Sequence, residues 1–218
     1  MSESIDLQMR RAIVAGELPP SSKLQMEQLK ARFNVGFSPI REALSRLLGE
    51  GLVELEPNRG FRVAGLTRDD LEDIATTRIA IETAALKRSI ARRNDEWEVG
   101  IIGALHRYRL ATGGQFSDPE QMRRWEEAHD ALHASFIANC GSPRLITMQR
   151  RLQEQQLRYR RLAVHPGVSE RADVQEHENL VATILKGDAE EAVAEIARHL
   201  MLTLDLLDLE GFWERYGQ

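Results

Sequence analysis

The helical spacing of apolar residues from Thr67 onward is the feature that most restricts the fold of this chain. Apolar residues there recur every three or four positions, and no convincing alternating pattern of a strand interrupts them. The breaks between the apolar stripes fall at residues that commonly start helices, namely Thr67, Asn94, Asp118, Ser169 and Asp188. Residues 67–218 are therefore predicted to form an all-α antiparallel helical bundle.

Residues 1–66 have a different layout. Apolar spacing predicts three short helices, the first beginning at Ile5, the second at Met26, and the third at Pro39 with Ser38 as its N-cap. "ELPPSSKL" between the first two helices is predicted to be a loop. After the third helix, "LVELE" and "FRVAG" alternate as strands around the turn "PNRG". This order predicts a winged helix-turn-helix, so the fold class is mainly α, with residues 1–66 and 67–218 as two domains.

The third helix of such a domain lies in the major groove of DNA, with its N-terminal residues facing the base edges. Arg41 falls in its first turn, where the helix dipole disfavours a cation, and a DNA partner would compensate for that cost. Arg59, at the tip of the wing, suits a minor groove or a phosphate. The alternative is a small helical domain that docks proteins, in which Arg41 pairs with a nearby acid. The expected DNA-binding residues are Gly36, Phe37, Ser38, Arg41 and Arg59.

The motifs "SPIREAL", "L..EGLV" and "RGF.V" occur in this order in residues 5–65, which resemble the N-terminal domain of GntR-family transcription regulators. The resemblance implies that Ser38, Arg41 and Arg59 contact double-stranded operator DNA. Many members carry Ser/Thr-Arg where this chain has Gly36-Phe37, so their base preference is not transferred to it.

Four of the six histidines, on three apolar stripes, are the candidate metal ligands: His129, His133, His177 and His199. A buried imidazole needs a partner, because an unpaired buried polar group is costly. One divalent metal ion could satisfy all four if the three helices converge. Alternatively, each ring bonds to its own carbonyl or carboxylate.

Residues 70–206 resemble the FadR C-terminal, or FCD, ligand-binding domain, through "R..IE", "H...H..F..NCGSPRL", "EH..L" and "ARHL". The resemblance implies a divalent metal held by His133, His177 and His199, with His129 standing where the family has Asp or Asn. An all-nitrogen site favours Zn²⁺ or Ni²⁺ over Mg²⁺. The family's arginine corresponds to Arg78, which is expected to bind a small carboxylate effector.

Arg158, within "RYRRL", is a second candidate for the cation that binds the effector. For both arginines the alternative is a surface or inter-helix ion pair. The "VGFSP" and "NCGSPRL" segments look most like the dicarboxylate-sensing branch of the family, which suggests a short dicarboxylate or hydroxy acid as the effector.

The segment "HDALH", residues 129–133, also resembles the paired histidines of a zinc hydrolase. In that reading Asp130 would be the general base. However, it is one methylene shorter than the usual Glu and points about 100° around the helix from His129. Four protein ligands would also occupy the open position that a catalytic zinc needs. A metal-dependent hydrolase is therefore the alternative, and no enzyme activity is expected.

Composition restricts the partners further. Residues 1–65 hold nine basic and eight acidic residues, whereas the remainder holds 20 and 26, and the pI is about 5.8. This excludes indiscriminate nucleic-acid binding but allows a local basic face. A single cysteine, Cys140, excludes an internal disulfide. With no signal peptide and no membrane-spanning run, the chain is expected to stay in the cytoplasm. The resemblance to GntR-family regulators implies a homodimer that acts as a repressor.

Overall fold

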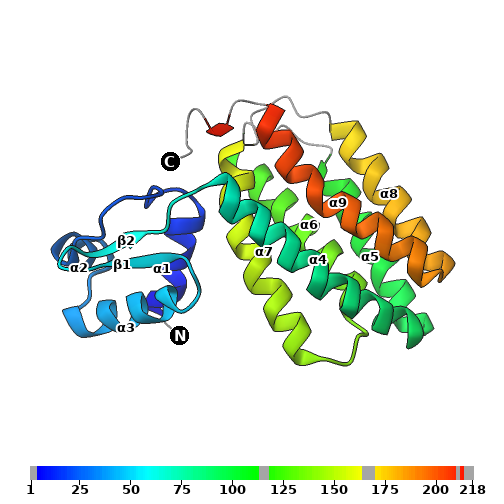
Figure 1. Ribbon diagram of the computed structural model, residues 1–218, viewed down its shortest axis with the longest axis horizontal. Helices are drawn as coiled ribbons and strands as arrows, with labels where there is room; N and C mark the ends of the chain where they lie inside the picture. The colour runs from blue at the N-terminus through cyan, green and yellow to red at the C-terminus, as the bar shows by residue number, and fades with distance from the viewer. Residues whose placement is uncertain (1–3, 113–117, 164–169, 210–211, 214–218) are drawn as a thin grey trace. The chain divides into compact units, whose positions relative to one another are not determined.

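The computed structural model describes residues 4–112, 118–163, 170–209 and 212–213 (Figure 1). The chain divides into two compact units: unit 1 contains residues 1–74, 154–163 and 206–218, and unit 2 contains residues 75–153 and 164–205. The elements in chain order are α1 (Ile5–Val14), α2 (Met26–Phe33), α3 (Phe37–Leu48), β1 (Val53–Glu56), β2 (Gly60–Val63), α4 (Arg68–Ala91), α5 (Asp95–Thr112), α6 (Pro119–Ile137), α7 (Pro143–Ala163), α8 (Glu170–Lys186) and α9 (Ala189–Leu209).

Unit 1 contains a winged helix-turn-helix, as the sequence predicts. Helix α1 packs on α3, and their apolar faces form one buried cluster that includes Met9, Ile40 and Leu44. Strands β1 and β2 pair antiparallel, with Val53 opposite Val63 at one end. The hairpin and α3 therefore enclose the core from different sides and leave the start of α3 on the surface.

Two local predictions in this unit are wrong. Helix α3 begins at Phe37 with Gly36 in the N-cap position, so Ser38 already lies inside the helix, and its hydroxyl bonds to Glu42 one turn later. The "ELPPSSKL" segment is not only a loop, because Lys23 forms an antiparallel bridge with Arg62 of β2. This bridge supplies hydrogen-bond partners to an edge that would otherwise expose unpaired backbone groups.

The helix starts of the C-terminal part agree well with the sequence. At four predicted N-caps a side-chain oxygen accepts a backbone N–H two or three residues later, at 2.9–3.1 Å, namely at Thr67, Asn94, Asp118 and Asp188. Each of these bonds satisfies an N–H that has no partner within the helix. The predicted cap at Ser169 lies outside the described residues.

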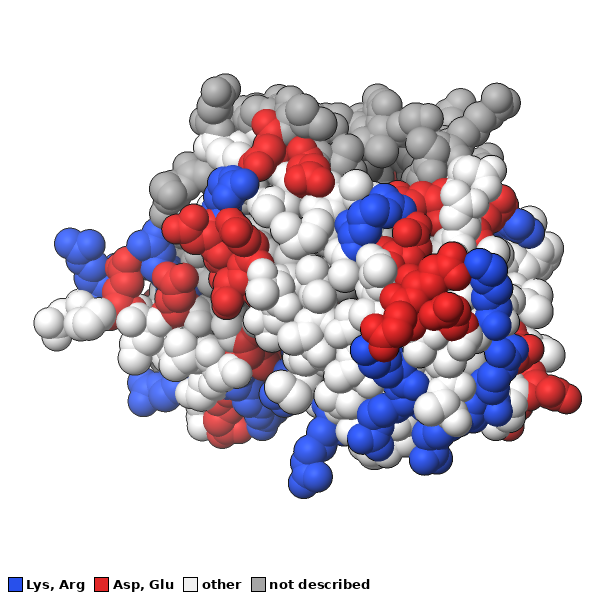
Figure 2. All heavy atoms as spheres, turned by 45° about the vertical axis from the view of Figure 1, so that its right-hand side comes forward, with Lys and Arg blue, Asp and Glu red and all other residues white. Residues whose placement is uncertain are grey.

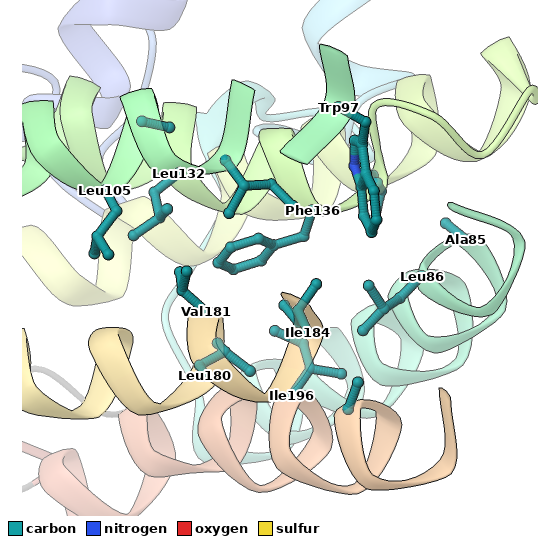
Figure 3. Close-up of a cluster of buried hydrophobic side chains, with 14 of the residues drawn as sticks. Ala85, Leu86, Trp97, Leu105, Leu132, Phe136, Leu180, Val181, Ile184 and Ile196 are labelled. Atoms are coloured by element: carbon teal, nitrogen blue, oxygen red, sulfur yellow. The ribbon is translucent and has the colours of Figure 1, made fainter. Parts of the chain in front are cut away.

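Unit 2 is helical in its described part and has its own apolar core. Figure 3 shows Leu105 of α5, Phe136 of α6 and Val181 of α8 pointing toward one another, with side chains of α4 and α9 closing the cluster. Helix α5 packs against both α6 and α8. In the described part of the chain, none of the helices combines the length and the apolar character that crossing a bilayer requires.

Candidate metal centre

The four predicted histidines of unit 2 come together from three helices. His129 and His133 lie one turn apart on α6 and so share a face, while His177 comes from α8 and His199 from α9. Each ring offers a nitrogen, and these four atoms all lie within 4.8 Å of one another. The predicted convergence of the three helices is thus confirmed.

The spacing of the rings fits a common ion. The Nε2 atoms of His133 and His199 lie 3.1 Å apart. Two nitrogens bound to one Zn²⁺ at about 2.0–2.1 Å lie roughly 3.0–3.4 Å from each other, depending on the angle at the metal. Without an ion between them, one of the two nitrogens must carry a proton and donate it to the other.

The alternative, in which every histidine bonds to its own carbonyl or carboxylate, fails at His133. Its Nε2 faces another imidazole, and its Nδ1 is buried without a hydrogen-bond partner among the described residues. Leaving a buried polar atom unpaired costs about 1–3 kcal/mol. The arrangement is therefore easier to explain as a ligand set than as four separately satisfied core histidines.

Aromatic rings surround the cluster. Tyr108 lies with its ring centroid 4.7 Å from that of His177, Trp125 lies 5.6 Å from His129, and Phe136 lies 5.5 Å from His133. Because these side chains are buried, they keep water away from the imidazoles.

Burial also keeps His133 neutral. The side chain is 1% exposed, and this burial, followed by the charges of His129, His199, His177 and Arg78, holds its pKa well below the ordinary value. A neutral imidazole is the form that binds a metal, so His133 needs no deprotonation before it can act as a ligand.

A carboxylate that sequence reasoning missed supports one of these rings. The Nδ1 atom of His199 lies 2.9 Å from Oε1 of Glu176, which accepts its hydrogen and leaves Nε2 as the donor atom toward the cluster. Burial alone would raise the pKa of the Glu176 carboxyl, but the bond to His199 and the neighbouring charges lower it overall. Metal-binding histidines almost always carry such an outer partner.

Arg78 lies on α4 in a buried ion pair with Glu82, one turn later. Its Nε and Nη2 lie 2.7 and 2.6 Å from the same carboxylate oxygen, and the two side chains are 5% and 2% exposed. Arg78 is thus engaged in an ion pair, although this pair is buried and lies within one helix, unlike the surface or inter-helix pair of the alternative. The charge of Arg78 still acts on the histidine cluster, because it helps to lower the pKa of His133.

Arg158 has a backbone partner of its own, and its assignment to the effector site stays a prediction. It belongs to unit 1, where its buried guanidinium donates a hydrogen bond to the backbone carbonyl of Ala64. The four histidines belong to unit 2. Burial lowers the pKa of Arg158, although nearby acidic groups oppose the shift.

The predicted DNA-contacting residues lie at the start of α3 and at the hairpin turn. Phe37, the first residue of α3, is 42% exposed, and Lys30 Nζ lies 4.8 Å from its ring centroid. Arg41 and Arg59 are exposed, and neither forms an ion pair with any residue that the structure describes. The alternative in which Arg41 is neutralised by a neighbouring acid thus has no support among those residues.

Asp130, the general base of the hydrolase alternative, lies beside a candidate ligand. Its Oδ1 is 3.5 Å from Nδ1 of His129. A carboxylate in this position can orient the His129 ring, which is again the role of an outer partner.

Two family matches cover most of the chain. Residues 1–63 match the bacterial regulatory proteins of the gntR family, and residues 73–201 match the FCD domain.

Curated relatives and solved structures agree with these matches. The chain is 34% identical to the HTH-type transcriptional regulator BphR of Paraburkholderia xenovorans over 91% of this chain and 82% of that protein. It is 30% identical to the HTH-type transcriptional repressor GlaR of Escherichia coli over 91% and 92% of the two chains. The structure of E. coli McbR/YncC superposes with a TM-score of 0.76 over 96% of this chain and 99% of that one, at 18% identity, so this likeness concerns the fold.

Proposed function

The chain belongs to the GntR family of bacterial transcription regulators and carries its FCD domain, and we propose that it is a repressor controlled by a metal-bound small carboxylate. It is a DNA-binding regulator and not an enzyme, as its relatives are. Repression is proposed because the relative GlaR is named a repressor.

The single observation that carries the proposal is the convergence of four imidazoles from α6, α8 and α9 in a buried, aromatic-walled site. Four nitrogen donors favour Zn²⁺ or Ni²⁺ over metals that prefer oxygen. Because imidazoles are neutral, they leave the full positive charge on a bound ion, and that charge would attract an anionic ligand. By expanding its coordination beyond the four imidazoles, the ion would hold the effector carboxylate, while the protein supplies shape and further charge.

Arg78 is proposed as the second contact of the effector. Its guanidinium is buried next to Glu82, and a guanidinium has five N–H donors, which suit bidentate binding of a carboxylate. An effector with two acidic groups could then bind the metal with one carboxylate and Arg78 with the other. This motivates the choice of short dicarboxylates and hydroxy acids as test compounds.

Operator binding is proposed for the start of α3 and the wing. Charges of both signs lie interspersed on the face shown in Figure 2, which fits the acidic pI and restricts DNA binding to a local surface. Exposed Phe37 and Arg41 suit base edges, and Arg59 suits a groove or phosphate. A homodimer would place two such surfaces on a palindromic operator.

Metal content tests the ligand set. Purified wild type, reloaded with Zn²⁺ and dialysed, is expected to retain about one ion per chain by elemental analysis. His177→Ala is expected to lose it while operator affinity without metal stays largely unchanged. His106→Ala, which changes an exposed histidine of α5, is the matched control. Equal zinc in wild type and His177→Ala would refute the ligand assignment.

Operator release tests the effector. Short dicarboxylates and hydroxy acids are added to the repressor–operator complex in a gel shift, with and without Zn²⁺. Since an effector that releases DNA must bind the DNA-free form more tightly, release should require both metal and acid. Arg78→Lys keeps the buried charge but loses the bidentate geometry, so it should need more acid for the same release. Release of the operator by the same concentration of acid with and without Zn²⁺ would contradict the proposal.

A further inference from the structure

A lysine of α2 covers the aromatic ring that begins α3. The ammonium of Lys30 lies 4.8 Å from the centroid of the Phe37 ring, within the roughly 6 Å over which a cation is attracted to the face of a ring. Both side chains are exposed, so the contact holds a long and otherwise flexible side chain in one place at the surface. The ring thereby positions the ammonium beside the start of the helix that is proposed to enter the major groove.

We propose that Lys30 and Phe37 act as a pair that selects one base of the operator. The ammonium donates hydrogen bonds to O6 and N7 of a guanine, and the ring holds the ammonium in position for this contact. Phe37 is thus a positioning residue for Lys30. The inference rests on the proposed operator binding and deepens it, because it names a base and adds a residue of α2 to those of α3 and the wing.

Positive charge gathers at the start of α3. No acidic residue lies in the first turn of this helix, and its N-terminal end carries the positive pole of the helix dipole. Lys30 and Arg41 add two cations near this end, and neither forms an ion pair with a residue in the described ranges. The arrangement costs free energy in the isolated chain, and electronegative atoms of a partner would relieve it. In the major groove, O6 and N7 of guanine are such atoms.

A groove between α2 and the start of α3 gives a base edge access to the ammonium. It has a volume of about 550 Å³, and its lining residues are Glu27, Lys30, Ala31, Asn34, Val35 and Gly36. Glu27 lies three positions before Lys30 on α2, a spacing that allows an ion pair. Among the described residues, however, neither of the two forms one, and the ammonium lies over the Phe37 ring instead.

The carboxylate of Glu27 favours a base over a phosphate as the partner of Lys30. A phosphate in this groove would lie close to that carboxylate, and like charges repel. A guanine edge carries no net charge, so it meets the ammonium without this repulsion. The cytosine paired with the guanine presents an N–H donor, which a carboxylate can accept. The two charged groups of the groove therefore match the two halves of one G·C pair.

Selection of duplexes from a randomised DNA pool by the full chain tests the base. The wild type is expected to select a guanine at one position of each half-site, and Lys30→Ala is expected to lose this preference while keeping the others. On the operator that the wild type selects, Lys30→Ala should bind about tenfold or more weakly at matched salt. Replacing the G·C pair by A·T should weaken the wild type by a similar factor and Lys30→Ala much less.

Arg32→Ala is the matched control, because Arg32 lies on the same helix but pairs with Glu17. It should keep the base preference and the operator affinity of the wild type. Lys30→Ala is expected to fold, since the position is exposed and alanine is a good helix former.

The role of the ring is tested by the same selection. Phe37→Leu keeps an apolar side chain but removes the ring, so it should lose the guanine preference, whereas Phe37→Tyr keeps the ring and should keep the preference. Equal preferences of these two variants would refute the positioning role of Phe37.

Two results would overturn the contact of Lys30 with guanine. One is a guanine preference that survives in Lys30→Ala. The other is an equal loss of affinity for the operator and for unrelated duplexes, which would indicate a phosphate contact instead. A wild type that selects no sequence would refute the proposed operator binding as well, so failure of the pair alone stays distinguishable from failure of the proposed function.

Discussion

At the scale of single residues, the bond between His199 and Glu176 favours a metal site over a set of packed histidines. A carboxylate that accepts the Nδ1 hydrogen fixes the tautomer, so Nε2 keeps its lone pair and points toward His133. Two lone pairs at 3.1 Å repel unless a cation or a proton lies between them. The outer carboxylate would therefore be part of such a metal site, although it would not touch the ion itself.

Loss of this carboxylate charge should weaken the site without removing a ligand. Glu176→Gln is expected to lower zinc affinity by about 10- to 100-fold, because the amide no longer makes the His199 ring more basic. Competition with a chromophoric chelator measures the affinity. Glu178→Gln is the control, since Glu178 lies on the same helix but pairs with Arg109 instead. Equal affinities in the two variants would exclude a role for Glu176.

Arg41 provides the residue-scale prediction for DNA. Arg41→Ala should weaken operator binding by about 1–3 kcal/mol, because the exposed guanidinium at the start of α3 loses its contact with a base or phosphate. Gel shifts at matched salt measure the loss. Arg46→Ala, on the last turn of the same helix and paired with Asp6, should change affinity much less. An unchanged operator affinity in Arg41→Ala would contradict the DNA-binding assignment.

At the scale of helices and strands, local signals were readable in the sequence and contacts between distant segments were not. The caps at Thr67, Asn94, Asp118 and Asp188 were predictable because each bond joins residues two or three positions apart. The bridge between Lys23 and Arg62 was missed because it depends on where β2 lies. Glu176 was missed for the same reason, because its contact with His199 depends on how α8 packs against α9. The hydrogen bond from Arg158 to the carbonyl of Ala64 was also missed, because the two residues lie far apart in the sequence.

The cap of α9 should contribute measurably to stability. Asp188→Ala removes an acceptor for two backbone N–H groups and a negative charge at the positive end of the helix, so it should lower the free energy of unfolding by about 0.5–2 kcal/mol. Urea unfolding measures the loss. Asp205→Ala, at an exposed position in the same helix, should cost nothing, because alanine is the better helix former there. Equal effects of the two changes would show that the cap is not stabilising.

At the scale of the whole molecule, the candidate DNA-binding residues and the candidate metal ligands belong to different units. The winged helix-turn-helix belongs to unit 1, and the four histidines and α5 belong to unit 2. The sequence predicted this division of function, because the strand pattern ends before Thr67. It placed a boundary at residue 66, whereas in the folded chain residues 67–74, 154–163 and 206–218 also belong to unit 1. A single boundary in the sequence cannot describe this division, since α4, α7 and α9 each contain residues of both units.

Metal should therefore stabilise the folded chain through unit 2. An ion that binds only the folded state at 100 times its dissociation constant adds about 2.7 kcal/mol, which for a chain of this size raises the melting temperature by roughly 5–10 °C. Calorimetry with Zn²⁺ should show this rise in the wild type and its reversal by a chelator. His177→Ala should show little of it, because the ligand set is broken while the rest of the core remains. If zinc raised the melting temperature of both proteins equally, the ion would be binding elsewhere, and the histidines would be core residues after all.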